Sequence, residues 1–356
     1  MARISWISTI AAVGALSLVA CSGDKGDTGG GAEGGGAGDD GGACSVTFTH
    51  NNPGDGETEW YYKAAIEVEL SEADDTTAIT VTDGGGAAVD GTVSFSDDGV
   101  TAYFTPSADL APSTSYTVDV SVCNGGGSGS ISFSTSDLGT PLTCDLSGDT
   151  FRVNLADARF LKPAGVAALL LDALEDDILV GVQSMGDADL EMLGALSDGL
   201  GGGQNLCYPS IPFPPASFDD PAFEVGPADT TLNVSGVELE ISNLSISGAF
   251  ASDCSYFGGG QLAGELDARV LGPLVGDLLG VTDPDEICGL LVTFGVTCDS
   301  CSSDGQPYCA EVLVDQIVAS NAAITLSCVS LEECHPSCPT SGDNPECADP
   351  LDGVCD

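Results

Sequence analysis

The chain has 356 residues and a formal net charge of −48, because 55 Asp or Glu outnumber 7 Lys or Arg. Phosphate recognition depends on clustered Lys and Arg, so this composition excludes nucleic acid and anionic membrane faces as binding partners. The chain is not a disordered acidic tail, since 42% of its residues are hydrophobic and the acids are scattered among them. We interpret the acidic surface as a source of solubility or of tolerance to high salt, with weak binding of divalent cations as the alternative.

An apolar segment from Trp6 to Ala20 follows the single basic residue Arg3. It is too short to cross a hydrocarbon layer of about 30 Å, and it ends in small residues before Cys21, as an export signal does. Leu18, Ala20 and Cys21 resemble the lipobox of bacterial lipoproteins. The resemblance implies that the Cys21 thiol receives a diacylglycerol, that the preceding residues (1–20) are the signal peptide, and that Cys21 is a lipid anchor. An ordinary secretory signal with a chance cysteine is the alternative.

This signal predicts a protein of the cell envelope, lipid-anchored at the outer membrane or cell surface. Its predicted partner is the membrane, reached through acyl chains with palmitate among them, and other envelope proteins or polysaccharide are further candidates. Residues 21–43 are mostly Gly and Asp. Because a Gly-rich coil spans about 5–6 Å times the square root of its residue number, this flexible tether reaches on the order of 25 Å.

The cysteine count fits an exported protein. Of 15 Cys, the anchor Cys21 leaves 14, an even number. An oxidising compartment favours disulfides over free thiols, so we expect up to seven bridges. Cys44 and Cys123 are the only cysteines of the first folded region, and they should pair with each other if that region folds alone.

Residues 44–138 have the pattern of a β-sandwich, with short alternating segments divided by Gly, Asp, Asn and Pro. In Ile66–Leu70, aliphatic residues alternate with glutamates, which places them on opposite faces of a strand. Asp97-Asp98-Gly99 indicates a hairpin turn. The predicted strands are Ser45–Thr49, Ala65–Leu70, Ala78–Thr82, Thr92–Phe95, Thr101–Thr105, Ser115–Val122 and Ser130–Thr135.

The order of motifs in this region resembles the SbsA-type bacterial immunoglobulin-like domain. The motifs are Asn52-Pro53-Gly54-Asp55-Gly56, Gly91-Thr92-Val93-Ser94, Tyr103-Phe104-Thr105-Pro106, Leu110-Ala111-Pro112-Ser113-Thr114-Ser115-Tyr116-Thr117-Val118 and Phe133-Ser134-Thr135. Tyr116 is placed like the tyrosine that closes a corner in Ig-like folds. The resemblance implies a spacer or adhesive module and no catalyst. Trp60-Tyr61-Tyr62 is interpreted as packing, with a carbohydrate-stacking platform as the alternative.

Residues 143–328 are expected to form a disulfide-stabilised α+β domain, because strands and helices occur in blocks without strict alternation. Ile211–Pro215 contains three prolines and must be extended loop or edge. Helices are predicted at Val166–Leu174, Leu190–Leu196, Val270–Leu279 and Glu286–Leu291. Strands are predicted at Phe151–Leu155, Ile178–Val182, Thr231–Val234, Glu238–Ile241, Ser245–Ala251, Gln261–Asp267 and Val312–Val318, with Tyr256–Gly260 as a fold-back.

The Cys-rich tail, residues 329–356, is too small and polar to form a hydrophobic core of its own, so disulfides must stabilise any fold that it has. Cys334-His335 with Cys338 has the residue types of a zinc site, but thiolates in an oxidising compartment are usually lost to disulfides. Cys298 and Cys301 are spaced like the two cysteines of a redox motif, but no thioredoxin-like βαβ pattern precedes them. We therefore expect structural disulfides there.

Other constellations give no catalytic prediction. Ser184 lies in a sequence that misses the spacing of a nucleophile elbow. The acid groups Asp172, Glu175 and Asp176, and Asp283, Asp285 and Glu286, are interpreted as helix-start and solvent-face acids. We predict no catalytic residue, no cofactor and no located metal site, while a structural calcium ion stays open without a position.

Three hypotheses on function remain. The first is a non-enzymatic lipid-anchored surface protein, in which the Ig-like spacer presents the second domain for binding or envelope architecture. The second is an exported carbohydrate-active hydrolase using Asp or Glu in residues 143–328, although 6% aromatic residues supply few stacking side chains. The third is a carrier of an apolar ligand, suggested by the aliphatic stretches Val166–Leu174 and Leu271–Leu279.

Overall fold

The computed structural model describes residues 44–163, 176–199, 201–234, 237–271, 281, 283–293 and 296–330. These residues belong to one compact unit that begins at Cys44. The predicted signal peptide, Cys21, the tether, almost all of the Cys-rich tail and the predicted helix Val166–Leu174 lie outside the described residues. Among the described residues, no helix is long and apolar enough to span a bilayer.

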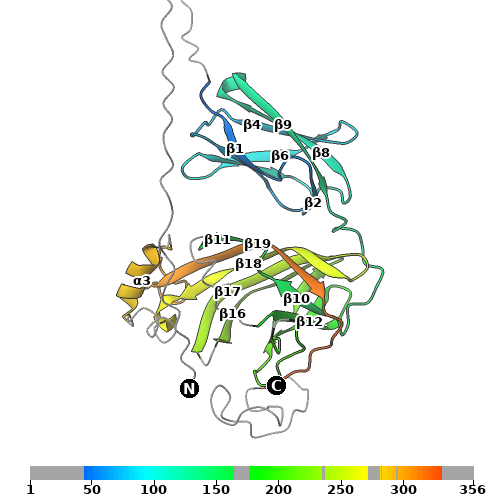
Figure 1. Ribbon diagram of the computed structural model, residues 1–356, viewed down its shortest axis with the longest axis vertical. Coiled ribbons are helices and arrows are strands. Elements are labelled where there is room, and N and C mark those ends of the chain that lie inside the picture. Colours follow the sequence, from blue (N-terminus) through cyan, green and yellow to red (C-terminus); the bar gives the residue numbers. More distant parts are fainter. Residues whose placement is uncertain are drawn as a thin grey trace, which may run out of the picture. The chain divides into compact units, whose positions relative to one another are not determined.

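Residues 48–135 fold into two packed sheets (Figure 1). All seven strands predicted for this region are present, and two short strands are added, β2 and β5. One sheet has the order β1-β3-β7-β6 and the other β2-β9-β8-β4-β5. The bounds are β1 Phe48–Asn52, β2 Glu57–Trp60, β3 Ile66–Leu70, β4 Ala78–Asp83, β5 Ala88–Val89, β6 Gly91–Phe95, β7 Thr101–Pro106, β8 Ser115–Val122 and β9 Gly127–Thr135.

Alternation along the strands builds the core of this sandwich. In β8, Tyr116, Val118, Val120 and Val122 are buried, and the residues between them are partly or fully exposed. The predicted tyrosine corner is confirmed, because the Ala111 N–H donates to the Tyr116 hydroxyl oxygen at 2.8 Å. Strands β6 and β7 form the predicted hairpin.

The second domain is an antiparallel sheet that closes on itself as an eight-strand barrel. Its strand order is β10-β12-β13-β15-β16-β17-β18-β19, and β19 pairs back with β10 through Phe151 opposite Asn321. Strands β11 and β14 pair beside this ring with β19 and β13. The bounds are β10 Thr150–Asn154, β11 Arg159–Lys162, β12 Ile178–Met185, β13 Asp189–Leu196, β14 Ile211–Pro212, β15 Ala216–Asp219, β16 Ala222–Val234, β17 Val237–Phe250, β18 Tyr256–Asp267 and β19 Cys309–Asn321.

Four phenylalanines fill the core of this closed sheet. Phe151, Phe223, Phe250 and Phe257 are each at most 3% exposed, and their rings contact one another with centroids 4.8–5.8 Å apart. Aromatic pairs at these distances add to the free energy gained by burying their area. The interior is therefore occupied by side chains of the chain itself.

The expected α+β class is wrong for the described part of the second domain. Its described helices are α3, Pro284–Val292, which confirms the helix predicted there, and a short 3₁₀ turn at Ala268–Leu271. Residues 272–279, the rest of a further predicted helix, lie outside the described residues. The predicted helix Leu190–Leu196 is strand β13, and the predicted fold-back Tyr256–Gly260 is the start of strand β18.

Burial on both faces explains the error at β13. Leu190 and Met192 point into the closed sheet, whereas Leu193 and Ala195 pack on its outer side beneath Leu326. A strand covered on both faces has a continuous apolar sequence without a period of two, and a short run of that kind cannot be distinguished from a buried helix by its pattern.

Candidate functional site

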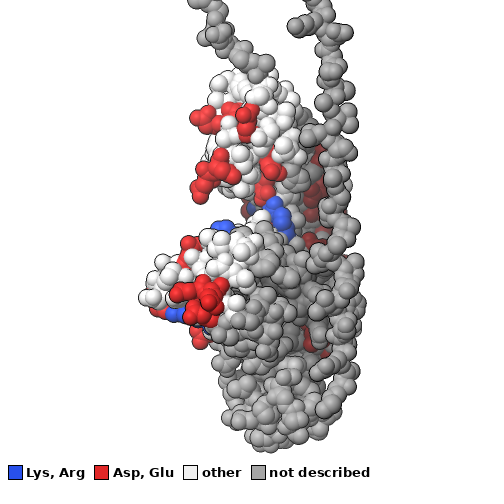
Figure 2. All heavy atoms as spheres, turned by 60° about the vertical axis from the view of Figure 1, so that its left-hand side comes forward, with Lys and Arg blue, Asp and Glu red and all other residues white. Residues whose placement is uncertain are grey.

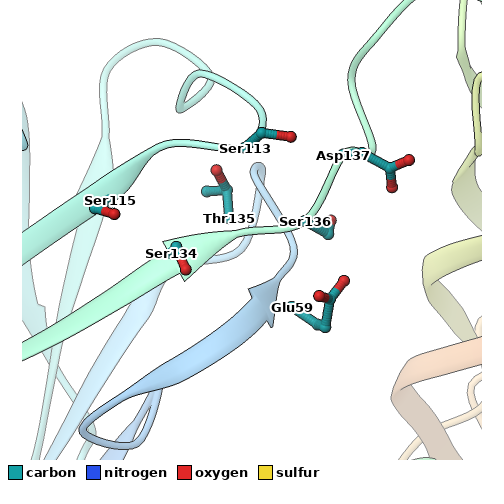
Figure 3. Close-up of a pocket in the computed structure, with 7 residues that line it drawn as sticks. All are labelled: Glu59, Ser113, Ser115, Ser134, Thr135, Ser136 and Asp137. Carbon is teal, nitrogen blue, oxygen red and sulfur yellow. The ribbon is translucent and has the colours of Figure 1, made fainter.

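A shallow hollow of about 450 Å³ opens at one end of the sandwich, and all of its lining side chains are polar (Figure 3). We call it the hydroxyl hollow. Its chemistry consists of hydroxyl and carboxylate groups only. The lining residues are Glu59, Ser113, Ser115, Ser134, Thr135, Ser136 and Asp137.

Backbone hydrogen bonds fix the walls of the hydroxyl hollow. Glu59 lies on the parallel edge strand β2, and Ser136 directly follows β9. The Ser136 N–H donates to the Trp60 carbonyl at 3.0 Å, and the Ser136 carbonyl accepts from the Ser113 N–H at 2.8 Å. The segment after β9 is thereby tied both to β2 and to the turn before β8.

The carboxylates of the hollow act on a tyrosine from the second domain. The Tyr256 hydroxyl donates to Asp137 Oδ1 at 2.8 Å. Burial raises the pKa of Tyr256 above its ordinary value, and the negative charges of Asp137 and Glu59 raise it further. Tyr256 is therefore held as a neutral hydrogen-bond donor, and one oxygen of Asp137 is committed to it.

The groups of the hydroxyl hollow do not form an activated nucleophile. Its lining contains no His, Lys or Cys to serve as a base for a serine. Carboxylates and hydroxyls together are suited to holding a cation or another polar group. This hollow is therefore a candidate binding site.

A second feature, which we call the domain joint, connects the sandwich to the closed sheet. Arg159 of β11 donates to both Glu67 oxygens at 2.7 and 2.8 Å, and its Nε donates to Asp315 Oδ1 at 2.9 Å. Glu67 lies on β3 of the sandwich and Asp315 on β19 of the closed sheet. Hydrogen bonds to both carboxylates raise the pKa of Arg159 above its already high value. One guanidinium thus joins the two domains.

Apolar packing extends the domain joint. Ala249 and Ala251 of the second domain belong to the same buried cluster as the sandwich core. Gly259 has a φ of +58°, and a Cβ there would lie 2.1 Å from the ring of Tyr61. Only glycine fits this position, because it tolerates both the left-handed backbone and the close approach of the ring. Two alanines of the second domain therefore pack into the core of the sandwich, while the phenylalanine core of the closed sheet is a separate cluster.

Sequence reasoning missed the domain joint. The scarcity of basic residues was an available signal, because a lone arginine among many acids is a candidate for a structural ion pair. The partners of Arg159 could not be predicted from the sequence, however, since Glu67 and Asp315 lie 92 and 156 residues away along the chain.

The structure places the cysteine candidates in disulfides. Cys44 bonds to Cys123 with the Cα atoms 5.8 Å apart. The redox-spaced pair is not joined to itself, because the bridges are Cys288–Cys298 and Cys301–Cys309. A further bridge joins Cys144 to Cys254, and Cys207 and Cys328 are also disulfide-bonded. The zinc-type group of the tail lies outside the described residues.

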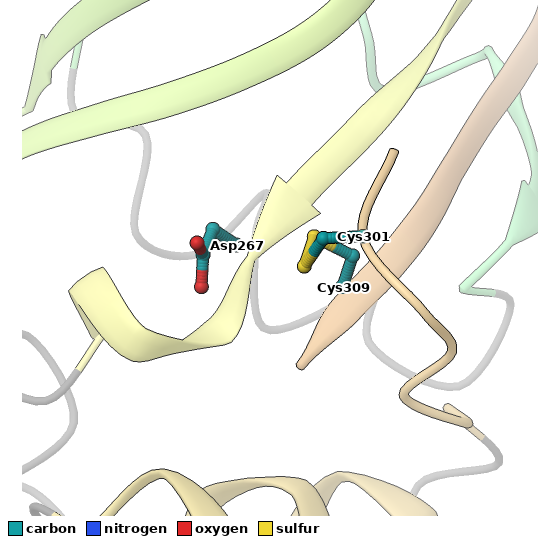
Figure 4. A group of neighbouring side chains, drawn as sticks. All are labelled: Asp267, Cys301 and Cys309. Atoms are coloured by element: carbon teal, nitrogen blue, oxygen red, sulfur yellow. A yellow bond between two sulfur atoms is a disulfide. The ribbon is translucent and has the colours of Figure 1, made fainter. Parts of the chain in front are cut away.

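One group of side chains has the composition of a metal site but cannot act as one. Asp267, Cys301 and Cys309 place their ligand atoms within 4.8 Å of one another. The two sulfurs are bonded to each other, as Figure 4 shows, and so neither is a thiolate. Asp267 pairs with Arg269. The group is a disulfide beside an ion pair.

Asp172 and Glu175 lie outside the described residues, and other remaining candidates have structural roles. Ser184 lies within strand β12, and its hydroxyl donates to exposed Glu191 at 2.8 Å, so it is not at a strand-to-helix elbow. Asp283 caps α3 by accepting from the Asp285 N–H at 2.9 Å, which confirms the helix-start interpretation. Asp176 accepts a hydrogen bond from the Gly199 N–H at 3.1 Å.

The aromatic cluster of the sandwich packs inward. Trp60 is 3% exposed and Tyr62 is 5% exposed, while Tyr61 is partly buried against the same core. Trp60 and Tyr62 leave no flat exposed face for a sugar, and the Tyr61 ring packs against Gly259. The packing interpretation is therefore confirmed over the stacking platform.

Comparison with known families identifies the sandwich. Residues 43–136 match the bacterial Ig-like domain. This Ig-like domain covers about a quarter of the chain, and it indicates an extracellular or cell-surface protein. No curated protein matches the chain.

Solved structures show only distant likeness. CopC from Methylosinus trichosporium OB3b has 15% identity and a TM-score of 0.23, covering 26% of this chain and 93% of its own. PcoC, a copper resistance protein from Escherichia coli, has 16% identity and a TM-score of 0.23, covering 25% and 99%. Domains 1–6 of the surface layer protein SbsC have 12% identity and a TM-score of 0.23, covering 63% and 33%. These scores carry no argument about the chemistry of this chain.

Proposed function

We propose that the protein is a non-enzymatic, lipid-anchored protein of the cell surface. In this proposal the Ig-like domain is a spacer that holds the closed-sheet domain away from the membrane for binding or for envelope architecture. The membrane is contacted through the acyl chains on Cys21, at the outer membrane or cell surface. Envelope proteins or polysaccharide are the partners that an exposed acidic protein of this kind meets.

The observation that carries the proposal is the domain joint. A spacer presents its neighbour in a defined orientation only if the two domains do not swing freely, and inter-domain motion is the default where an interface is small and polar. Here the two domains share buried apolar side chains, and Arg159 bonds to carboxylates of both. In this proposal these contacts hold the closed sheet to the Ig-like domain.

Surface charge supports the choice of partners. In Figure 2, acidic side chains make up most of the charged surface on the visible face. Each Lys or Arg of the described residues is already paired with a carboxylate, so none forms a free basic patch for a phosphate. The pairs are Lys63 with Asp109, Arg152 with Asp177, Arg159 with Glu67 and Asp315, Lys162 with Glu311, and Arg269 with Asp267 and Asp304.

The other two hypotheses gain no support from the described residues. The interior of the closed sheet is filled by its own phenylalanines, which leaves no observation in favour of an apolar carrier. The exposed aromatic surface that sugar binding needs is not supplied by Trp60 or Tyr62. The spacer proposal is the one with positive observations behind it.

Cell fractionation tests the proposal. Intact cells are treated with protease, and detergent phase separation is applied to the wild type, to Cys21→Ser and to the tether control Thr28→Ala. We expect the wild type and Thr28→Ala to be protease-accessible and to enter the detergent phase, and Cys21→Ser to leave that phase. Equal partition of the wild type and Cys21→Ser into the aqueous phase would contradict the lipid anchor, and full protection from protease would contradict surface exposure.

A further inference from the structure

Strand β6 is an open edge of the Ig-like sandwich. It ends the sheet order β1-β3-β7-β6, and among the described strands it pairs on one side only, with β7. Its residues from Gly91 to Phe95 are all exposed. A strand with one free side presents unpaired N–H and C=O groups, to which another strand can bond.

The hydrogen bonds to β7 show which backbone groups of β6 are free. The Ser96 N–H donates to the Thr101 carbonyl at 2.9 Å. Bonding alternates along an antiparallel pair, so every second residue back from Ser96 bonds to β7. The backbone N–H and C=O groups of Gly91, Val93 and Phe95 therefore point away from the sheet.

The apolar side chains of this edge are partly uncovered. Val93 and Phe95 are each 36% exposed. They lie opposite Phe104 and Ala102 of β7, which are buried in the sandwich core. Residues directly opposite each other share one face of a sheet, so the core face of this sheet continues onto β6 and ends there. A further strand beside β6 would extend that face and bury both side chains.

Strand β6 lacks the features that protect the other edges. Natural edge strands are short, charged, interrupted by proline or bent by irregular pairing. Among the described edge strands, β5 and β14 have two residues each, and β1, β2 and β11 have shifts in their pairing register. Strand β6 has five residues in continuous register and no charged side chain. It is therefore the described edge that is best suited to accept another strand.

Acidic side chains flank both ends of β6. Asp90 precedes the strand, Asp97 and Asp98 follow it, and all three are exposed. None of the three takes part in the ion pairs of the described residues. A second copy of the chain would bring the same acids to the same edge, where like charges repel. A segment with a basic residue at each end and apolar residues between them matches both the charge and the uncovered face.

We propose that β6 binds an extended segment of a partner protein by strand addition. Alternate apolar residues of the segment lie beside Val93 and Phe95, and a Lys or Arg lies beside the acids at each end. Backbone hydrogen bonds give such a contact its affinity, and the side chains give it selectivity. The Ig-like domain then supplies a binding edge in addition to its spacer role. This role does not depend on the lipid anchor, so loss of the anchor and loss of strand addition are separate results.

Two synthetic peptides test the edge in the full mature chain, residues 21–356. Lys-Thr-Val-Thr-Val-Thr-Val-Lys has a basic residue at each end, and Glu-Thr-Val-Thr-Val-Thr-Val-Glu is its control with the same alternation. Fluorescence anisotropy of the labelled peptides measures binding. We expect saturable binding of the Lys peptide and at least about tenfold weaker binding of the Glu peptide, because the latter places like charges opposite one another. Equal binding of the two peptides, or no saturable binding of the Lys peptide, would overturn the proposal.

Amide hydrogen exchange, followed residue by residue by NMR, locates the bound peptide. In the free chain, the outward N–H groups of Val93 and Phe95 should exchange faster than the bonded N–H groups of Thr92 and Ser94. Saturating Lys peptide should slow exchange at Val93 and Phe95 at least about tenfold. Diffuse attraction to the acidic surface would leave both rates unchanged and would contradict strand addition. Protection of both amides in a dimer of the chain alone would assign the edge to a second copy and would contradict it too.

A proline variant removes one outward donor. The Val93 N–H has no bond to β7, and proline is tolerated on edge strands where the N–H faces solvent, so Val93→Pro leaves the bonds to β7 in place. It should abolish saturable binding of the Lys peptide. The control Val93→Ala keeps the N–H and should retain binding. Equal affinity of the two variants would refute the role of the backbone edge.

A charge variant keeps the test valid if Val93→Pro folds poorly. Asp90→Asn with Asp97→Asn should weaken binding of the Lys peptide by about threefold or more, since two exposed ion pairs are lost. The control Glu69→Gln with Asp119→Asn removes two charges from exposed positions on strands that do not pair with β6, and it should leave binding unchanged. Equal weakening by the two double variants would show attraction to the polyanion as a whole and would overturn the proposal.

Discussion

Replacing Arg159 with Met tests the domain joint most sharply. The substitution removes a cation that makes charged hydrogen bonds to Glu67 and Asp315 and leaves the two carboxylates without it. Breaking a fully buried pair in this way costs about 3–5 kcal/mol. The side chains of Arg159, Glu67 and Asp315 are 30%, 23% and 12% exposed, so solvent screens part of that cost. We expect Arg159→Met to lower the free energy of unfolding by about 3 kcal/mol.

A matched control lies on the same strand. Lys162 also pairs from β11 to β19, through Glu311, but the two side chains are 54% and 53% exposed. Exposed pairs contribute about 0–1 kcal/mol, so Lys162→Met removes a similar charge and length with little effect. At about 2–4 °C per kcal/mol for a folded region of this size, Arg159→Met should lower the melting temperature by roughly 6–12 °C.

Scanning calorimetry and urea unfolding of the two variants give the comparison. Hydrogen exchange should in addition show faster opening at β3 and β19 in Arg159→Met than in the wild type. The reasoning is refuted if Arg159→Met and Lys162→Met lose the same stability within about 0.5 kcal/mol, because the bridge would then contribute no more than a surface pair.

Three further predictions concern the Ig-like domain and its contacts. Tyr116→Phe removes the acceptor of the Ala111 N–H, and losing this part-buried hydrogen bond should cost about 0.5–1.5 kcal/mol in urea unfolding. Replacing Cys44 and Cys123 together by Ala opens a loop of sequence separation 79, which the chain-entropy relation converts to a loss of at most about 4.5 kcal/mol. Burial, and then Asp109, raise the pKa of Tyr62 to about 12, so the folded state favours the neutral phenol. That stability is complete below about pH 10, the ordinary tyrosine value, and declines as the pH rises toward 12.

Each of these has a control. Tyr103→Phe, on the outer face of β7, should cost less than about 0.5 kcal/mol, and a loss equal to that of Tyr116→Phe would remove the corner explanation. Opening the Cys301–Cys309 loop, of separation 8, should cost at most about 2.5 kcal/mol, and the reverse order of the two losses would contradict the entropy account. Tyr62→Phe should flatten the alkaline decline, and an unchanged profile would show that other groups cause it.

The sandwich was predictable because several of its strands, among them β3, β7 and β8, bury one face. In β8, buried residues alternate with exposed ones along eight positions, and the sequence shows that period directly. The short strand β2 escaped prediction because only its last residue, Trp60, is buried. The resemblance to Ig-like folds also identified the corner at Tyr116, whose bond reaches only five residues upstream.

The second domain, the domain joint and the hydroxyl hollow all depend on long-range contacts. Strand β13 is covered on both faces, and so its sequence lacks the period that distinguishes strand from helix. Closure of the sheet depends on pairing β10 with β19, more than 150 residues apart. The hydroxyl hollow combines β2 with the segment after β9, and no local pattern places Glu59 beside Asp137.

The most direct test of the central claim is the intact mass of the protein extracted from membranes of its native cells. A lipid-anchored surface protein predicts a mass equal to residues 21–356 plus acyl chains, with the modification located on Cys21 after digestion. A mass without acyl chains, or an unmodified Cys21 in the extracted protein, would contradict the account.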